Sequence, residues 1–324
     1  PVEGKKDAFI FMADRWRPRN LGDSRYVWLP IHFENGYPVL KWMENWSLET
    51  FDELLPDKND PTTYNGYNLV WNDEFDINGA PDSNVWSFEK GFVRNNELQW
   101  YQEDNAVCND GVLTITARGE RKDNPMYEAG SDFWAHKREK IEYSSSSIKT
   151  LGNKEFQYGR FEVRARIPTA GGSWPAIWTL GTDMEWPSNG EIDIMEYYRI
   201  DGVPHILANT AWGTDTRFNA EWDSSATPFS YFTDKDPNWA DKFHIWRMDW
   251  DEEAIRLYLD DELLNETLLS ETINGSLGDH KNPFMQPHYI LLNLAIGGRH
   301  GGALDVDAFP LNYEVDYVRV YQNK

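Results

Sequence analysis

The chain has 324 residues, with 31 Lys and Arg against 54 Asp and Glu, so its formal net charge is −23. This charge excludes the basic surface that nucleic acid or acidic lipids require. We expect no membrane-spanning segment, because no run of about 18 apolar residues occurs. A single cysteine excludes a disulfide framework. Aromatic residues make up 15% of the chain, more than packing requires, which favours a carbohydrate cleft.

Residues 1 to about 60 differ from the rest of the chain. Three short strands are expected, at 8–13, 26–31 and 39–42. Residues 1–55, through the segment MADRWRPRNLGDSRYVWLPI, resemble the C-terminal end of five-bladed propeller glycosidases related to exo-β-1,3-galactanases. Three strands make at most one propeller blade, so this part holds no propeller active site. We expect an N-terminal appendage at 1–60 that ends in a polar, Pro-bounded linker at 57–61, and a separate β domain at 61–324.

From residue 67 onward, strand patterns dominate the sequence. Apolar and polar residues alternate at 112–117 and 161–167, which predicts strands with one buried face. Further strands are expected at 243–250, 255–259, 263–264, 289–296 and 313–321. No helical periodicity lasts beyond two turns, and strands do not alternate with helices. The pattern therefore predicts an all-β sandwich.

The segment 190–198 (GEIDIMEYY) also predicts a strand, and it carries three acids. Glu191 and Asp193 share one face, because side chains two residues apart point the same way. Glu196 lies five residues after Glu191 and falls on the other face of a regular strand. One extra residue near Ile194 and Met195, a β-bulge, returns Glu196 to the face of the other two acids. We therefore predict a bulge between Ile194 and Glu196.

Three adjacent carboxyl groups suit glycoside hydrolysis. Like charges raise at least one pKa, so one carboxyl stays protonated as the acid while another attacks as a carboxylate. Asp193, in the middle, can share a proton with a neighbouring Glu. The alternative is an acidic solvent-facing strand, because in so acidic a chain about one match to this spacing arises by chance. The aromatic segments just upstream, which contain Trp174, Trp178 and Trp186, favour the catalytic interpretation.

Residues from about 67 to 322 resemble glycoside hydrolase family 16, in its laminarinase-like branch. The similar segments, in order, are LVWNDEFD, NNELQWY, GVLTITAR, YGRFEVRARIP, GGSWPAIWTLG, WPSNGEIDIMEYY, NLAIGG and FPLNYEVDYVRVYQ. The resemblance implies a jelly-roll β-sandwich, similar to concanavalin A, with a concave substrate cleft. It also implies a retaining endo-acting glycoside hydrolase that needs no cofactor for catalysis.

The resemblance also implies roles for individual residues. Glu191 is expected to be the nucleophile, Glu196 the acid/base, and Asp193 the group that assists between them. The residues expected to contact the polysaccharide or oligosaccharide substrate are Trp174, Trp178, Trp186, Asn95, Asn96, Trp212 and Asn293. A structural calcium ion is implied at Asp316, with a solvated or salt-bridged Asp as the alternative. The resemblance further implies a secreted or cell-surface enzyme, and we expect a monomer.

One departure from the family bears on the substrate. Laminarinases return from the catalytic strand with a segment similar to Thr-Val-His-Tyr, whose His lies near the acid/base, whereas this chain has Trp212 at the matching place. An indole there suits the apolar face of galactose. The first expectation is a β-1,3-glucan substrate, and the alternative is an endo-β-1,3-galactanase or another β-galactan hydrolase. A non-catalytic carbohydrate-binding jelly roll, which would not need both Glu191 and Glu196, is the alternative of another class.

Overall fold

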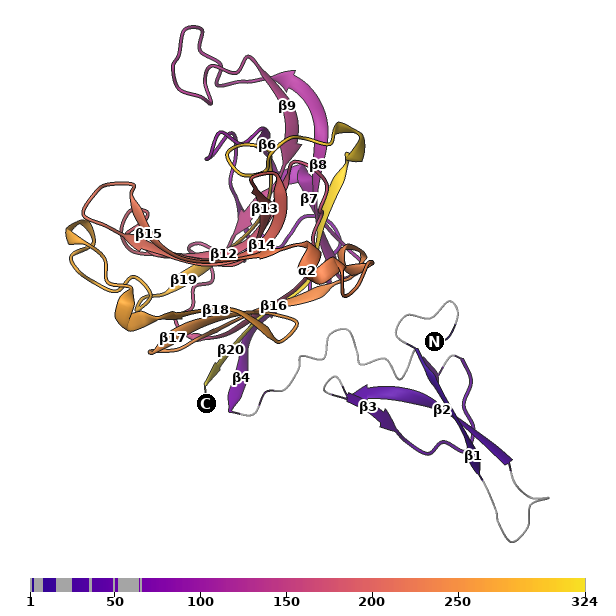
Figure 1. Cartoon of the computed structure of the whole chain (residues 1–324). Helices are drawn as coiled ribbons and strands as arrows, with labels where there is room; N and C mark the ends of the chain where they lie inside the picture. The colour runs from indigo at the N-terminus through magenta and orange to yellow at the C-terminus, as the bar shows by residue number, and fades with distance from the viewer. Residues whose placement is uncertain are drawn as a thin grey trace. The chain divides into compact units, whose positions relative to one another are not determined.

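The computed structural model of the chain describes residues 2, 8–15, 25–34, 37–48, 50–51, 64 and 66–323 (Figure 1). The chain forms two compact units, Pro1–Asn68 and Leu69–Lys324. The predicted linker at 57–61 and the predicted boundary at residue 60 lie outside the described residues. Each unit is therefore considered by itself.

The N-terminal unit contains the three strands that the sequence predicts. They are β1 (Ile10–Arg15), β2 (Arg25–Glu34) and β3 (Tyr37–Leu40). They form one antiparallel sheet in the order β1-β2-β3. The indole nitrogen of Trp46 donates to the carbonyl of Trp28 on the middle strand at 2.7 Å, which ties the segment after β3 to the sheet.

The larger unit consists mainly of two sheets. The first has the order β15-β14-β13-β12-β19-β10-β5. Its strands are β5 (Ser87–Phe88), β10 (Ser147–Lys149), β12 (Ser173–Gly181), β13 (Glu191–Ile200), β14 (Val203–Gly213), β15 (Ala220–Pro228) and β19 (His288–Ile296). The strand with the three acids, β13, lies between β12 and β14, so both of its edges are hydrogen-bonded.

The second sheet follows the order β18-β17-β16-β11-β20-β8-β9-β6, with β4 also on β20 and β7 on β8. Its strands are β4 (Tyr67–Asp73), β6 (Gln99–Tyr101), β7 (Ala106–Asn109), β8 (Val112–Asp123), β9 (Lys140–Ser145), β11 (Gly159–Arg166), β16 (His244–Trp250), β17 (Ala254–Leu259), β18 (Glu262–Leu268) and β20 (Leu311–Asn323). The strands predicted from alternating residues are confirmed here.

Helical segments in the described part of this unit are short. They are α2 (Ser230–Thr233) and 3₁₀ turns at Glu103–Asn105, Trp239–Asp241, Leu269–Glu271, Ser276–Gly278 and Val306–Ala308. Among the described residues, no helix has the length and apolar character needed to cross a membrane.

The two sheets lie face to face (Figure 1) and share one core. Ile192 and Leu292 enter it from the seven-stranded sheet, and Trp246 and Val318 enter it from the other. Burying this apolar surface is the main force that holds such sheets together. The expectation of an all-β sandwich is confirmed. The seven-stranded sheet packs on the core with one face, so its other face, called here the outer face, is available for a functional site.

Gly190 starts the strand that carries the acids. Its φ of +81° lies in the left-handed region, which favours glycine. A Cβ there would lie 2.8 Å from Cβ of Pro283, so the space is closed as well. This residue therefore fixes how the chain turns from the 182–189 loop into β13.

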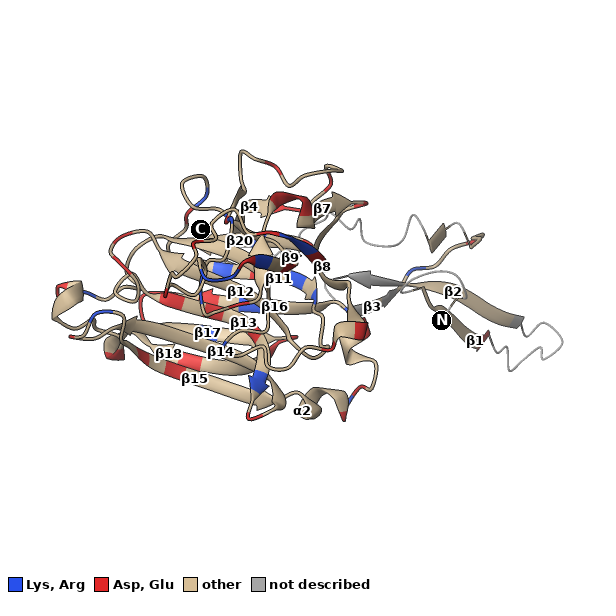
Figure 2. Cartoon of the chain, turned by 90° about the horizontal axis from the view of Figure 1, so that it is seen from above, with Lys and Arg blue, Asp and Glu red and all other residues tan. Residues whose placement is uncertain are grey.

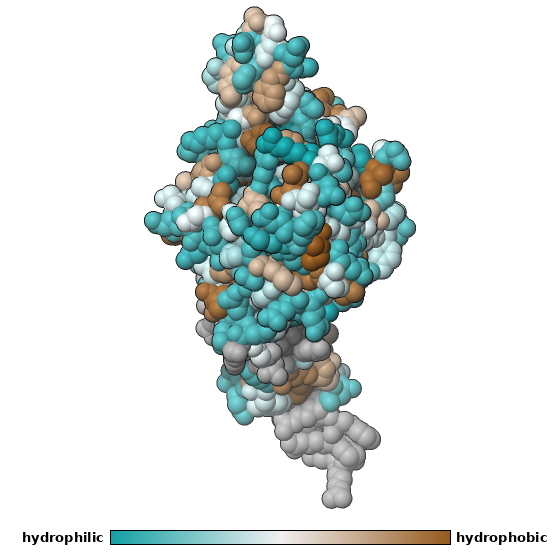
Figure 3. Space-filling view, turned by 90° about the vertical axis from the view of Figure 1, so that its left-hand side faces the viewer, coloured by the Kyte–Doolittle hydropathy of each residue, from teal (hydrophilic) through white to brown (hydrophobic). Residues whose placement is uncertain are grey.

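The surface of the larger unit reflects its charge. Seen from above, acidic residues lie along the strands of the seven-stranded sheet (Figure 2). On the face in Figure 3, hydrophilic residues cover most of this unit, and hydrophobic residues are scattered.

Candidate active site

Strand β13 carries an extra residue between two of its acids. Asp193 lies opposite Trp178 on β12, and Met195 lies opposite the adjacent residue Ile177, so Ile194 has no counterpart. Both Ile194 and Met195 then face the core. The predicted bulge is confirmed, and its position follows from the apolar character of these two residues.

The bulge brings the three acids to the outer face of the sheet. On the other side of β13, Asp193 lies opposite Asn209, and Glu196 lies opposite Leu207 on β14. Glu191 remains on the face of Asp193, because the strand is regular between them. The structure therefore brings Glu191, Asp193 and Glu196 together in one row.

Asp193 is 2% exposed and hydrogen-bonds to Glu191. Burial, together with the charges of Glu196 and Glu191, raises the pKa of Asp193 well above its ordinary 3.8. Burial also raises the pKa of Glu191 above 4.5, while hydrogen bonds from Trp186 and Asp193 and the charge of Arg94 offset part of this rise. The hydrogen bond between the two carboxyl groups raises the pKa of Asp193 and lowers that of Glu191, so it favours the protonated form of Asp193 and the ionised form of Glu191.

Glu196 accepts hydrogen bonds on both carboxyl oxygens. The indole nitrogen of Trp174 donates to Oε1 at 2.8 Å, and Nδ2 of Asn209 donates to Oε2 at 3.2 Å. Burial still raises the pKa of Glu196 to about 7, with the charges of Glu191 and Glu97 adding to the rise. A carboxyl with this pKa is a suitable general acid near neutral pH.

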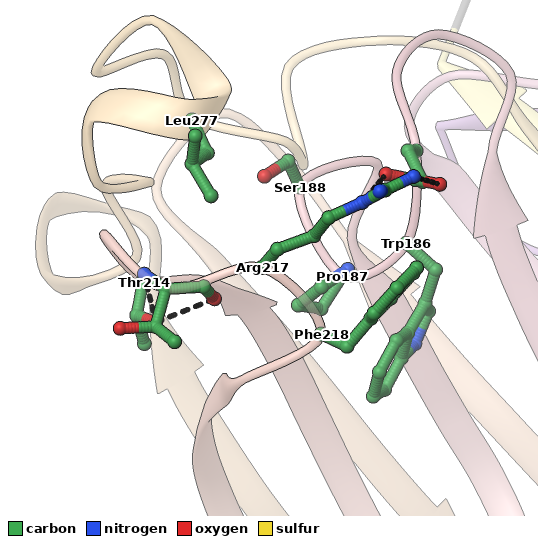
Figure 4. Close-up of a pocket in the computed structure, with 9 residues that line it drawn as sticks. Trp186, Pro187, Ser188, Thr214, Arg217, Phe218 and Leu277 are labelled. Atoms are coloured by element: carbon green, nitrogen blue, oxygen red, sulfur yellow. Dashed lines mark hydrogen bonds and ion pairs between the residues drawn. The ribbon is translucent and has the colours of Figure 1, made fainter.

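Trp186 lines a surface pocket of about 160 Å³ and also hydrogen-bonds to Glu191. Its indole nitrogen donates to Oε2 of Glu191 at 2.5 Å. Figure 4 shows Trp186 beside Phe218, with Arg217 across the rim, where it pairs with Glu185 at 2.7 Å. Phe218 is 57% exposed and has a φ of +60°, a conformation that a bulky residue rarely adopts. Two aromatic side chains thus line a hollow next to the first acid.

Trp178 and Asn293 are largely buried beside the acids and do not form an open surface for a sugar. Trp178 is 8% exposed, its ring lies 5.0 Å from the guanidinium of Arg94, and its indole nitrogen donates to Asn293 at 2.7 Å. The amide of Asn293 also donates to the hydroxyl of Tyr101 at 3.1 Å. Sugar contacts by Trp178 and Asn293 stay predictions, and the structure shows that both already bind other side chains.

Asn95 and Asn96 occupy a turn beside the row of acids. Both have positive φ values, 56° and 52°, which Asn tolerates better than most residues. The amide of Asn95 lies 3.4 Å from Oε1 of the buried Glu97. Arg138 donates to the backbone oxygens of Asn96 and Glu97, which holds the turn in place. Contacts of either Asn with sugar stay predictions.

The interpretation of Trp212 as a wall of the cleft is wrong. Ala211 is the cross-strand partner of Glu191 and shares its face, so Trp212 points to the opposite side. Trp212 packs against the core between the sheets, on the same side as the buried Thr210. The residue of β14 that reaches the acids is Asn209. A sequence comparison without strand register assigns the wrong parity to this segment.

Replacing Trp212 is therefore expected to affect stability rather than specificity. Trp212→Ala removes packing at the edge of the core and should lower the free energy of unfolding by about 3 kcal/mol, the low end for a buried Trp. KM should change less than threefold. Urea unfolding and steady-state kinetics at 25 °C test both parts, and a variant of unaltered stability with altered KM would contradict them.

Asp316 does not fit a calcium site. It is 8% exposed and pairs with Arg164, whose guanidinium lies 4.8 Å from the ring centre of Phe243. Within residues 66–323 and the described N-terminal segments, no group of three or more His, Cys, Asp or Glu side chains could hold a metal ion. The guanidinium supplies the positive charge that the family resemblance assigns to calcium, so the expectation at Asp316 is not supported.

Sequence reasoning missed Asn209, Arg94 and Phe218. Nothing in the local sequence marks Asn209, because only the register of β14 against the bulge places it between two acids. Arg94 was detectable, since it adjoins the NNELQWY segment that carries the family resemblance. Phe218 lies in the loop between β14 and β15, and loop conformation is not encoded by periodicity.

The comparisons with known proteins agree with this geometry. The sequence pattern of "Glycosyl hydrolases family 16" matches residues 94–319, which include all three acids. The chain belongs to this family. It is therefore a glycoside hydrolase, and the predictions of enzyme class and family are confirmed. The shared family also supports endo action with retention and catalysis without a cofactor.

Relatives of this family match about four-fifths of the chain. The "Beta-glucanase" of Rhodothermus marinus is 36% identical over 79% of this chain and 85% of its own length. The "Glucan endo-1,3-beta-glucosidase A1" of Niallia circulans is 31% identical over 80% of this chain, which spans only 38% of that relative. The laminarinase catalytic domain of Thermotoga maritima has a TM-score of 0.64 and 31% identity, over 80% of this chain and 99% of that domain.

A further structure, described as "Prominent members of the human gut microbiota express endo-acting O-glycanases to initiate mucin breakdown", has a TM-score of 0.70 and 33% identity. The alignment covers 80% of this chain and 92% of that one. These structures share the jelly-roll sandwich, so the predicted fold is confirmed.

Proposed function

We propose that the chain is a retaining endo-hydrolase of β-1,3-linked glucan. The observation that carries the chemistry is the row of Glu191, Asp193 and Glu196, with a buried Asp193 hydrogen-bonded to one Glu and a Glu196 whose pKa is about 7. The choice of glucan is supported by the 36% identity to a beta-glucanase. Secretion fits a polymeric substrate of this kind.

In the first step, the protonated carboxyl of Glu196 gives its proton to the glycosidic oxygen. The carboxylate of Glu191 attacks C1 at the same time, so the C1–O bond breaks and a covalent glycosyl ester forms. Asp193 and the indole N–H of Trp186 both hydrogen-bond to Glu191, which fixes the attacking carboxylate. The leaving chain departs as a neutral alcohol.

In the second step, Glu196 acts as a base. Its carboxylate takes a proton from water, whose oxygen attacks C1 and releases Glu191 as a carboxylate. Two inversions at C1 give net retention. Trp174 and Asn209 donate hydrogen bonds that stabilise Glu196 in this ionised state.

Aromatic and amide side chains supply the proposed sugar contacts. The pocket with Trp186 and Phe218 lies beside the nucleophile and is suited to stacking a sugar ring. Trp174 lies beside the acid/base, and Asn95 and Asn96 lie in the turn that carries Glu97. These contacts would orient the chain across the row of acids.

A β-galactan is the second candidate substrate. It is favoured by the TM-score of 0.70 to the structure described with mucin O-glycanases. The N-terminal unit, proposed here as a non-catalytic appendage, has its own resemblance to galactanase-like proteins. Trp212 no longer supports this candidate, because it faces the core.

The test is product release from laminarin, mixed-linkage glucan, β-1,3-galactan, agarose and mucin-type galactans. Internal cleavage of laminarin, with early oligosaccharides of β configuration by proton NMR, is the expected result. Inverted products would contradict the double-displacement mechanism. Release from a galactan alone would replace the glucan proposal with the second candidate.

The pH dependence of kcat/KM should be bell-shaped. Activity requires protonated Glu196, so it should fall as pH rises through about 7, the pKa of that carboxyl. It also requires ionised Glu191, whose raised pKa puts the acid limb above 4.5. Initial rates on laminarin between pH 4 and 9 check this shape, and full activity at pH 9 would contradict the role of Glu196.

A further inference from the structure

Three aromatic rings form a cluster at the end of the row that holds Glu196. The rings of Trp174, Tyr198 and His300 contact one another, with centres 4.7 to 5.6 Å apart. Tyr198 lies two residues after Glu196 on β13 and therefore shares its outer face, while the indole nitrogen of Trp174 donates to Glu196. This aromatic cluster gives a sugar ring a stacking surface beside the acid/base.

The loop that carries His300 also carries an arginine without a carboxylate partner. Arg299 is exposed, and among the described residues its guanidinium forms no ion pair. Its charge reaches the aromatic cluster, because partial burial and the charge of Arg299 lower the pKa of His300 below its ordinary 6.5. His300 is therefore largely neutral at neutral pH, and Arg299 carries the positive charge at this place.

The backbone of the 297–302 loop is held from two sides. The N–H of Arg299 donates to the carbonyl of Asn95 at 3.1 Å, and the N–H of Arg199 on β13 donates to the carbonyl of His300 at 3.3 Å. The loop is therefore fixed between β13 and the turn that contains Asn95. This arrangement keeps Arg299 next to the aromatic cluster.

Arginines without an ion pair are exceptional in the larger unit. Among its described residues, every arginine other than Arg138, Arg199 and Arg299 forms an ion pair with Asp or Glu. The chain has a net charge of −23, so carboxylates are plentiful. Three exceptions in one region indicate that their charges serve another partner.

The other two arginines lie against the same loop or the turn beside it. The guanidinium of Arg138 donates to the carbonyls of Asn96 and Glu97, next to the residue that binds the backbone of Arg299. The charge of the buried Glu97 acts on Arg138, but it also acts on Arg94. The guanidinium of Arg199 donates to two neutral carbonyls of the 169–170 segment, at 3.3 and 3.4 Å. These hydrogen bonds fix the backbone and leave positive charge uncompensated.

We propose that the aromatic cluster and Arg299 form a subsite for a sugar that carries a negatively charged group, a sulfate ester or a carboxylate. The sugar ring stacks on the cluster, and the guanidinium of Arg299 donates to the oxygens of the charged group. Arg138 and Arg199 add positive potential from the neighbouring turn and strand. The inference rests on the proposed hydrolase function and extends its substrate class from neutral to acidic β-glycans.

A charged sugar needs a local cation of this kind. Acidic residues lie along the strands of the seven-stranded sheet (Figure 2), and the row of acids itself repels an anion. Without a nearby cation, a negative group beside Glu196 would be repelled and would raise the pKa of Glu196 further. An arginine at this end of the row pairs with the anion and offsets both effects.

The test is competition among oligosaccharides for the inactive variant Glu191→Gln. Partial sulfation of β-1,3-gluco- and β-1,3-galacto-oligosaccharides gives one mixture, and partial carboxymethylation gives another, so each contains neutral and singly charged chains of equal length. Chains retained with the protein on ultrafiltration are quantified by mass spectrometry. Singly charged chains should be enriched about fivefold or more over neutral ones, the gain expected from one good exposed ion pair. Enrichment in only one mixture identifies the group as sulfate or carboxylate.

Salt and two substitutions locate the effect. The enrichment should shrink at about 0.5 M NaCl, which screens exposed charges. In the Glu191→Gln background, Arg299→Gln should abolish the enrichment and leave retention of neutral chains within twofold. Arg121→Gln removes the same charge from an exposed ion pair on β8 and should leave both quantities unchanged. Circular dichroism confirms folding of each variant.

Equal retention of charged and neutral chains, or retention of neither, would overturn the proposal. Enrichment that survives Arg299→Gln would also overturn it, because another surface would then select the anion. The proposed function is tested separately, by hydrolysis of neutral laminarin and neutral β-galactan with the unaltered protein. Failure of that hydrolysis refutes the proposed function, whatever the charged chains do.

Discussion

Glu191→Gln is expected to lower kcat on laminarin by about 10⁴-fold or more, equivalent to ~5 kcal/mol of transition-state stabilisation. An amide oxygen is a poor nucleophile, so the glycosyl ester does not form. KM should change little, because Gln keeps the size of Glu and can accept the hydrogen bond from Trp186. Stopped assays with a reducing-sugar readout measure the loss.

The control for this substitution is Glu314→Gln. Glu314 lies on the ten-stranded sheet and pairs with Arg166, outside the row of acids. It should keep kcat within twofold, which shows that loss of one carboxyl does not by itself inactivate the protein. Glu191→Gln should still bind laminari-oligosaccharides, as measured by calorimetry. Near-normal turnover by Glu191→Gln would require another nucleophile.

The bulge and the row of acids could be predicted because they follow from local rules. Period-two alternation fixes which residues face the core, and Ile194 and Met195 are both too apolar to lie beside carboxylates. Only an extra residue satisfies them and also keeps Glu196 with Glu191. Residues 191–196 therefore contain both the mismatch between the faces of Glu191 and Glu196 and the two apolar residues that form the bulge.

Local rules do not predict the faces on which Trp212 and Asn209 lie. Their faces depend on how β14 is aligned with β13, and the bulge changes that alignment partway along the pair. Similarity to a family segment placed Trp212 near the acid/base, although in the register Ala211 lies opposite Glu191. Cross-strand register is a tertiary property, so a one-residue error moved the prediction to the wrong face.

The environment of Asp316 was also hidden from the sequence. The motif around it fits the family, yet Arg164 comes from β11, more than 150 residues earlier. An ion pair between adjacent strands depends on which strands are neighbours, and the β11–β20 pairing is fixed only when the sheet assembles.

Glu196→Ala should give the second-largest loss, roughly 10²- to 10⁴-fold in kcat/KM on laminarin. Without the acid, the departing sugar leaves as an alkoxide, which is a poor leaving group. The corresponding loss on 2,4-dinitrophenyl β-laminaribioside should be small, because its phenolate leaves without a proton. Deglycosylation of that substrate remains slow, because no base activates water, so the glycosyl ester should accumulate and be visible by intact-protein mass spectrometry.

Added azide separates the acid/base from the nucleophile. The cavity left by the Glu196 side chain, flanked by Trp174 and Asn209, leaves room for a small anion that attacks C1 without a base. Azide should therefore accelerate turnover of the dinitrophenyl substrate in Glu196→Ala and yield the β-glycosyl azide. An α-azide, or azide rescue in Glu191→Ala instead, would reverse the assignment, because an anion in place of the nucleophile attacks from the opposite side of the ring.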